Sequence, residues 1–63
     1  MKNKIKQFRK QAGLRQEDMA LQLGVSRQTI IAIENDKYDP SLELAMKLAK
    51  LLNLKVEDVF ILE

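Results

Sequence analysis

The sequence contains no cysteine, no histidine and no tryptophan, and only two glycines and one proline among its 63 residues. Without cysteine and histidine, neither disulfides nor the usual zinc cages are available to stabilise the fold. So few glycines and prolines leave little turn chemistry for an all-β protein, and a hydrophobic content of 46% is too high for intrinsic disorder. We therefore expect one all-α domain over residues 1–63.

The short length and the missing residue types also bear on stability and on chemistry. A domain of this size buries only about 60% of the surface that its unfolded chain exposes, so dimerisation or very good helix packing must supplement the core. No cysteine nucleophile and no histidine acid or base is present, and a Ser–Lys or carboxylate pair needs a cleft that so short a chain can hardly enclose. We expect no enzyme, no metal and no cofactor.

The net charge of +2 is too small to indicate a nucleic-acid partner by itself, but it is unevenly distributed. Residues 1–16 carry six basic and no acidic side chains (+6), whereas residues 17–63 carry five basic and nine acidic ones (−4). The six are Lys2, Lys4, Lys6, Arg9, Lys10 and Arg15. This asymmetry favours a polyanionic partner on the N-terminal side, although such a run is more often a solvated helix face.

Membrane and export signals are missing from the sequence. No apolar run approaches the roughly 20 residues of a membrane span. No hydrophobic segment follows the basic N-terminus, so no signal peptide is expected. The lack of cysteine fits a reducing compartment, and we expect a cytoplasmic location.

Apolar spacing and capping residues predict five helices. Gly13 and Gly24 are expected to end the first two helices in the left-handed conformation, and Ser26 and Ser41 to begin the third and fourth as N-caps. The loop before Ser41 contains Pro40, which pushes the preceding residue out of the helical region. The predicted helices cover roughly residues 3–12, 16–23, 27–34, 41–52 and 56–60.

The second and third predicted helices are joined by Gly24-Val25-Ser26, which is typical of a helix-turn-helix. Gly24 turns without a Cβ clash, Val25 fills the angle between the helices, and Ser26 caps the second. Ala20 is small, as close crossing of two helices requires. A generic helical hairpin shares some of these features, so the pattern alone leaves both interpretations open.

The segment QEDMALQLGVSRQTI at residues 16–30, continuing as IEN at 33–35, resembles the Cro/cI-type (XRE-type) helix-turn-helix. KYDPSLELA at 37–45 is similar to the loop and fourth helix of that family, and VEDVF at 56–60 to its fifth helix. The resemblance covers nearly the whole chain and is strongest to short single-domain repressors of bacteria, archaea and phages. It implies a five-helix, lambda-repressor-like domain that places its recognition helix in the major groove of DNA.

Three positions depart from the family pattern. Arg15 and Lys55 stand where family members usually have a hydroxyl cap, and Asp36 stands where glycine is common after the recognition helix. Asp36 tolerates a left-handed conformation at some strain, and its charge is unhelpful near phosphates.

The recognition helix is expected to bury Ile30 and Ile33 and to point its opposite face at DNA. The candidate base contacts on that face are Arg27, Gln28, Ile31 and Ala32. Arginine pairs with guanine and glutamine with adenine through two hydrogen bonds, and Ile31 can touch a thymine methyl. The alternatives are two ordinary solvated polar residues and an exposed isoleucine without a role.

Contacts to the DNA backbone are expected around this helix. Gln16 heads the second helix, where its side chain and the backbone amides can meet a phosphate together. Asn35 and Lys37 match the backbone-contacting loop of the family. Further candidates are Thr29, Arg15 and Tyr38, although Tyr38 packed over Pro40 is an equal alternative. Lys2, Lys4, Lys6 and Lys10 are expected to add diffuse attraction to phosphates.

Arg9 lies on the apolar face of the first predicted helix. In the family that this chain resembles, the matching arginine pairs with the glutamate that matches Glu34, bracing the first helix against the recognition helix. The resemblance therefore implies an Arg9–Glu34 ion pair, and the alternative is an arginine that faces solvent.

One recognition helix reads only a few base pairs, and family members gain specificity as two-fold dimers on pseudo-palindromic sites. The apolar C-terminus supplies a surface for such pairing. The candidate dimer contacts are Leu54, Phe60, Ile61 and Leu62, with Leu44 or Leu51 as additional ones. Phe60 is also expected to close the protomer's own core.

The sequence thus predicts a homodimeric transcriptional regulator that represses by occluding a promoter, with double-stranded DNA as partner and no small-molecule effector. The first alternative is an antitoxin-type or other protein-interaction module whose helix-turn-helix is secondary. A small hydrolase is a third, which the composition barely supports.

Overall fold

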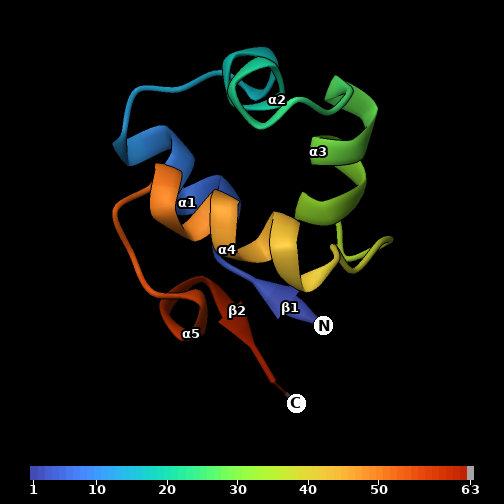
Figure 1. The fold of residues 1–63 in the computed structure, drawn as a ribbon, viewed down its shortest axis with the longest axis vertical. Helices are drawn as coiled ribbons and strands as arrows, with labels where there is room; N and C mark the ends of the chain where they lie inside the picture. Colours follow the sequence, from blue (N-terminus) through green and yellow to red (C-terminus); the bar gives the residue numbers. More distant parts are fainter. Residues whose placement is uncertain (63) are drawn as a thin grey trace.

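The computed structural model describes residues 1–62 (Figure 1). The elements in chain order are β1 (Lys2–Asn3), α1 (Ile5–Gln11), α2 (Gln16–Leu23), α3 (Arg27–Glu34), α4 (Leu42–Leu51), α5 (Val56–Val59) and β2 (Phe60–Ile61). Helix α4 crosses the middle of the molecule beside α1, with α2 and α3 on one side and α5 and both strands on the other. The predicted five-helix fold is confirmed. No helix among residues 1–62 is long and apolar enough to cross a membrane.

Capping residues set the helix boundaries. Ser26 Oγ accepts a hydrogen bond from the Thr29 N–H at 3.1 Å, and Ser41 Oγ accepts one from the Leu44 N–H at 3.2 Å. Each satisfies one of the donors that the first turn of a helix leaves without a backbone partner. Helices α3 and α4 consequently begin at Arg27 and Leu42, directly after these two serines.

The four longer helices end in the same way, through one residue with a left-handed backbone. These residues are Gly13, Gly24, Asp36 and Asn53, with φ of 73°, 70°, 59° and 59°. The N–H of the next residue then reaches back to a carbonyl five positions earlier, as from Val25 N to Ala20 O at 3.0 Å. This pattern, a Schellman motif, satisfies carbonyls that the last turn would otherwise leave unpaired.

The prediction of a first helix from residue 3 is wrong at its start. Residues 2–3 form β1, which pairs antiparallel with β2 in the register Lys2↔Ile61 and Asn3↔Phe60. The Asn3 Oδ1 atom accepts a hydrogen bond from the Ile5 N–H at 3.1 Å, so α1 begins only after that asparagine. The prediction that the last helix includes Phe60 is also wrong, because Phe60 pairs with Asn3 and lies in β2. A ladder of two residues per strand is too short to show the alternation that identifies a strand in a sequence.

The core takes side chains from every helix and from β2. Its buried members are Ile5, Met19, Ala20, Ile30, Ile33, Ala45, Leu48, Ala49, Val59 and Phe60. Partly buried residues such as Leu23 and Val25 pack against this cluster from the helix-turn-helix, and Leu54 and Val56 do so from the C-terminal segment. The angle between α2 and α3 is therefore fixed by packing as well as by the turn.

The turn between α2 and α3 offers a direct test of its backbone conformation. An alanine Cβ at Gly24 would meet nothing within 4 Å, so Gly24→Ala costs only the left-handed backbone. We expect a loss of about 1–2 kcal/mol in the free energy of unfolding, measured by urea denaturation. A synthetic chain with D-alanine at position 24 is the control and should retain its stability, because D-residues favour positive φ. Equal stabilities for the two alanine chains would contradict this.

Candidate nucleic-acid interface

Helix α3 presents two different faces. Ile30 and Ile33 are fully buried, whereas Arg27 and Gln28 are exposed at the N-terminal end of the helix. Ile31 and Ala32 are half-buried, so only part of each side chain remains accessible. The four candidate base contacts thus share one helix, and the two polar ones are the most accessible.

Helices α2 and α3 cross steeply. Figure 1 shows this crossing, with α2 seen nearly end-on and α3 running along the page. The turn that joins them leaves Ser26 exposed and Val25 half-buried against the core. The Thr29 hydroxyl lies 2.9 Å from Ser26 Oγ, so this candidate phosphate contact already has a partner in the cap of α3.

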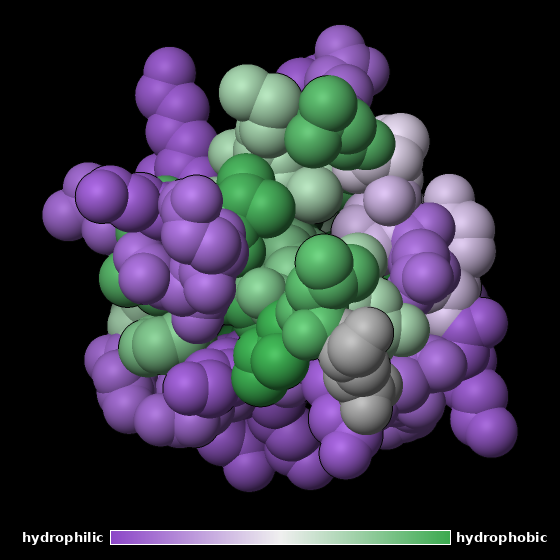
Figure 2. Space-filling model, turned by 90° about the horizontal axis from the view of Figure 1, so that it is seen from below, coloured by the Kyte–Doolittle hydropathy of each residue, from purple (hydrophilic) through white to green (hydrophobic). Residues whose placement is uncertain are grey.

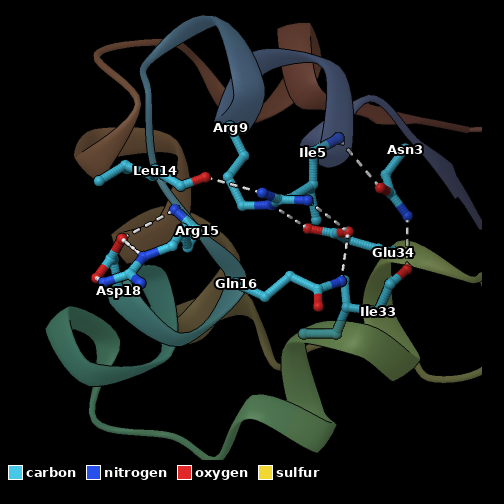
Figure 3. A network of polar contacts seen from close by, with 9 residues as sticks. All are labelled: Asn3, Ile5, Arg9, Leu14, Arg15, Gln16, Asp18, Ile33 and Glu34. Carbon is cyan, nitrogen blue, oxygen red and sulfur yellow. Dashed lines mark hydrogen bonds and ion pairs between the residues drawn. The ribbon is translucent and has the colours of Figure 1, made fainter.

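A buried ion pair joins α1 to the last turn of α3 (Figure 3). Arg9 Nε donates to Glu34 Oε2 at 2.7 Å and Arg9 Nη2 donates to Glu34 Oε1 at 3.3 Å. The two side chains are only 7% and 3% exposed. Arg9 Nη1 also donates to the Leu14 carbonyl at 2.8 Å, which ties down the chain between α1 and α2. The structure therefore brings Arg9 and Glu34 together as a bidentate pair.

Gln16 extends this network to the start of α2. Its Nε2 donates to Glu34 Oε1 at 3.2 Å, so the carboxylate receives bonds from two helices besides its own (Figure 3). The side chain expected to meet a phosphate is thus held in one orientation before any ligand arrives. The group that orients the Gln16 side chain is the Glu34 carboxylate, which the buried ion pair with Arg9 holds in place.

Arg15 is differently placed, since it is exposed and engaged by its own helix. Its Nε lies 3.2 Å from Asp18 Oδ2 and its Nη1 lies 3.2 Å from Glu17 Oε1. The Arg15 N–H donates to Asp18 Oδ2 at 3.0 Å, which is the largest cause of the lowered pKa of Asp18. The side-chain bond to Asp18 in turn raises the pKa of Arg15. Two carboxylates therefore compete with a phosphate for this guanidinium.

At the two positions that lack a hydroxyl cap, an acid three residues later binds the N–H of the cap residue itself. Asp18 accepts from the Arg15 N–H, and Asp58 Oδ2 accepts from the Lys55 N–H at 3.0 Å. A carboxylate in the first turn also interacts favourably with the positive end of the helix dipole. The N–H groups of Arg15 and Lys55 are therefore satisfied, although neither side chain caps the first turn of its helix.

A surface hollow of about 250 Å³ lies between the starts of α2 and α3. Its lining residues are Arg9, Arg15, Gln16, Glu17 and Arg27. Arg9 and Arg15 are already paired with carboxylates, so the positive charge that this hollow offers an anion comes from Arg27. The hollow also places the first residue of the recognition helix beside the first residue of α2.

The remaining predicted contacts lie elsewhere on the surface. Asn35, Lys37 and Tyr38 are all exposed in the loop after α3. The four lysines of the N-terminal segment are exposed as well.

An apolar face lies on the side of the molecule that carries α5 and the strands (Figure 2). Leu62 is 90% and Ile61 39% exposed, Leu54 is half-buried, and Phe60 is buried in the protomer's own core. Leu42 and Met46 on α4 are exposed and line a groove of about 930 Å³ between α4 and α5. Of the four predicted dimer contacts, Ile61 and Leu62 thus offer the most accessible apolar surface.

The prediction missed one residue of the network, Asn3. Its Nδ2 donates to the Ile33 carbonyl in the last turn of α3 at 2.8 Å (Figure 3). The same atom donates to Asp36 Oδ1, beyond the end of α3, at 3.0 Å. Asparagine is a preferred capping residue, and Asn3 lies two positions before the first apolar residue of α1, so it could have moved the predicted start of this helix. The long-range contacts to residues 33 and 36 have no local signature.

Helices α2 and α3 cross steeply and are joined by a three-residue turn, and α3 presents polar side chains at its N-terminal end. This arrangement defines a helix-turn-helix domain. A family model described as helix-turn-helix matches residues 5–59. The chain belongs to this family of DNA-binding transcriptional regulators.

Known proteins agree with this assignment. The chain is similar to an uncharacterized HTH-type transcriptional regulator, MJ0272, of Methanocaldococcus jannaschii, at 64% identity over all of this chain and 96% of the other. Its structure resembles the restriction-modification controller protein C.AhdI from Aeromonas hydrophila, with a TM-score of 0.81, 28% identity, and coverage of 89% of this chain and 85% of that one. It also resembles SinR, a master regulator for biofilm formation solved in complex with DNA, with a TM-score of 0.76, 30% identity, and coverage of 84% and 86%.

The buried ion pair is tested by a double-mutant cycle. Removing one partner leaves an uncompensated buried charge, so Arg9→Met and Glu34→Met alone should each lower the free energy of unfolding by about 3–5 kcal/mol. The double variant buries no charge and should be more stable than either single variant, measured by urea denaturation. Additive losses in the double variant would show that the two side chains do not interact.

Proposed function

We propose that the chain acts as a homodimeric repressor that inserts α3 of each copy into the major groove of a pseudo-palindromic operator. The observation that carries this proposal is the exposure of Arg27 and Gln28 at the start of α3, directly beside Gln16 at the start of α2. A regulator of this kind works where the genome is, which is the cytoplasm of a bacterial, archaeal or phage-infected cell.

Base recognition falls to the exposed face of α3. The Arg27 guanidinium can donate to O6 and N7 of guanine, and the Gln28 amide can pair with N6 and N7 of adenine. Ile31 and Ala32 keep part of their surface accessible, which suits contact with a thymine methyl.

Backbone contacts follow from the same orientation. The hollow between α2 and α3 offers a phosphate the Gln16 amide, which Glu34 already orients, whereas Arg27, which also lines it, is assigned to a base. Asn35, Lys37 and Tyr38 face outward from the loop beyond α3 and extend the contact along the strand. Arg15 and Thr29 are weaker contributors, because each already bonds a neighbour on its own helix or cap.

The two copies are proposed to pair through the apolar face beneath β2 and α5. Ile61 and Leu62 provide its exposed part, Phe60 is only 7% exposed, and Leu54 lines the groove between α4 and α5. The groove carries charges of both signs, from Lys47, Lys50, Lys55, Glu57 and Asp58. Such a surface can be complementary to itself across a two-fold axis, as a symmetric dimer requires.

Repression by occlusion needs nothing more than tight operator binding, and we propose no small-molecule effector. The second candidate is a protein-interaction module whose helix-turn-helix is secondary. The large apolar groove is the observation that favours it, and one related structure is described as a complex of SinR with the SinI protein.

Selection of bound sequences from a random duplex library tests the proposed function. We expect a pseudo-palindrome with half-site centres about 10 base pairs apart, which is one helical turn. Gln28→Ala should lose about 1–3 kcal/mol of discrimination at one base pair of each half-site, measured by competition binding. Gln7→Ala, the same change at an exposed position of α1, is the matched control and should leave the preference unchanged. A chain that prefers no duplex sequence would favour the interaction module.

The pairing surface is tested separately by sedimentation velocity. Leu62 is 90% exposed in the protomer, so Leu62→Asp should leave the fold intact while converting the dimer to a monomer. Leu21→Asp places the same charge at an 83% exposed leucine and should remain dimeric. Leu21 belongs to α2, a helix on the opposite side of the molecule from α5 and the strands. An unchanged dimer mass for Leu62→Asp would rule out this surface.

A further inference from the structure

The side chain of Asn3 joins the backbone at the start of α1 to the backbone at the end of α3 (Figure 3). Its Oδ1 accepts from the Ile5 N–H at 3.1 Å, at the start of α1. Its Nδ2 donates to the Ile33 carbonyl at 2.8 Å and to Asp36 Oδ1 at 3.0 Å. One amide thus satisfies a free donor of α1 and a carbonyl in the last turn of α3.

The exit of α3 is a place where such support matters. Asp36 has a φ of 59°, which is costly for a residue with a side chain. The Ile33 carbonyl accepts from the Asp36 N–H at 3.1 Å and also from Asn3, so the left-handed turn is held by a residue outside it. The Arg9–Glu34 pair holds the same helical turn from α1.

The backbone of Asn3 is fixed at the same time by the C-terminal strand. Asn3 lies opposite Phe60 in the ladder, and the Lys4 N–H donates to the Val59 carbonyl at 2.7 Å. Ile61 and Leu62, which follow directly, belong to the proposed pairing surface. Asn3 therefore stands between the end of the recognition helix and the segment through which two copies would pair.

We propose that Asn3 is a positioning residue for operator recognition, one that sets the end of α3 and its following loop relative to the C-terminal strand. This inference rests on the proposed function. A two-fold dimer recognises two half-sites at a fixed spacing. Hydrogen bonds from side chains to base edges tolerate displacements of only about 0.5 Å. A small movement of α3 against the pairing surface would thus weaken specific binding more than it weakens the fold.

Asn3→Asp tests this role with little change of shape. The new carboxylate still accepts from the Ile5 N–H, but it cannot donate to the Ile33 carbonyl and it repels Asp36. The measured quantity is the ratio of the dissociation constants for a scrambled duplex and for the selected operator, because the added negative charge acts on both. We expect this ratio to fall about tenfold, which corresponds to about 1.4 kcal/mol and to the loss of about one good base contact.

A rescue separates positioning from general damage. In Asn3→Asp combined with Asp36→Asn, the amide at position 36 donates to the new carboxylate. The contact between positions 3 and 36 is restored with its direction reversed and the net charge returns to that of the natural chain, whereas the bond to the Ile33 carbonyl stays lost. We expect the double variant to recover part of the lost ratio. Asp36→Asn alone keeps an acceptor for the Asn3 amide and should bind the operator with nearly unchanged preference.

Ser41→Ala is the matched control for lost stability, since it removes one capping bond, to the Leu44 N–H, from α4. It should lower the melting temperature and leave the ratio unchanged at temperatures where the chain is fully folded. If Asn3→Asp does not fold, Asn3→Ser takes its place, because it keeps a capping oxygen without the amide donor.

A ratio for the Asn3 variant equal to that of Ser41→Ala, or no recovery in the double variant, would overturn the role of Asn3 while leaving operator binding intact. Absence of sequence preference in the unaltered chain would instead overturn the proposed function, and the role of Asn3 with it.

Discussion

The buried pair of Arg9 and Glu34 is the interaction on which the rest of the arrangement depends. Removing two charges from water costs several kcal/mol for each ion. The attraction between the two ions offsets this cost only if their remaining donors and acceptors also find partners. Here the guanidinium also reaches the Leu14 carbonyl and the carboxylate also receives Gln16, and no buried side-chain nitrogen or oxygen among residues 1–62 lacks a partner. Apolar packing is not directional. This network is directional, so it fixes how α1, α2 and α3 are oriented about one another.

Local chemistry explains which parts of the fold could be predicted. Helices α2 and α3 have the predicted ends, since Gly24 and Ser26 mark them within a few residues of sequence. The β1–β2 ladder was missed because it pairs Asn3 with Phe60, almost a whole chain apart, over strands too short to show a pattern. For Arg9, the residues alone left a solvent-facing side chain open. Only the family resemblance pointed to Glu34.

The residue types of the candidate interface could be predicted, but most of their contacts could not. The sequence predicted polar residues at the N-terminal end of α3, but it could not show that Glu34 orients Gln16 or that Glu17 and Asp18 engage Arg15. The positive charge of residues 1–16 that is available to a partner is smaller than the sequence suggests, because Arg9 and Arg15 are both paired with acids. Long-range attraction to a polyanion then depends mainly on the exposed lysines, whose contributions are screened by salt.

The two-residue ladder has a thermodynamic consequence. It closes a loop that spans almost the whole chain, so its few hydrogen bonds oppose the entropy of bringing two distant segments together. A segment held in this way opens locally before the core does. In the proposed dimer the second copy covers this segment, and binding to the closed form alone would add to the free energy of folding. Protomer concentration would then set how firmly the ends of each chain stay closed.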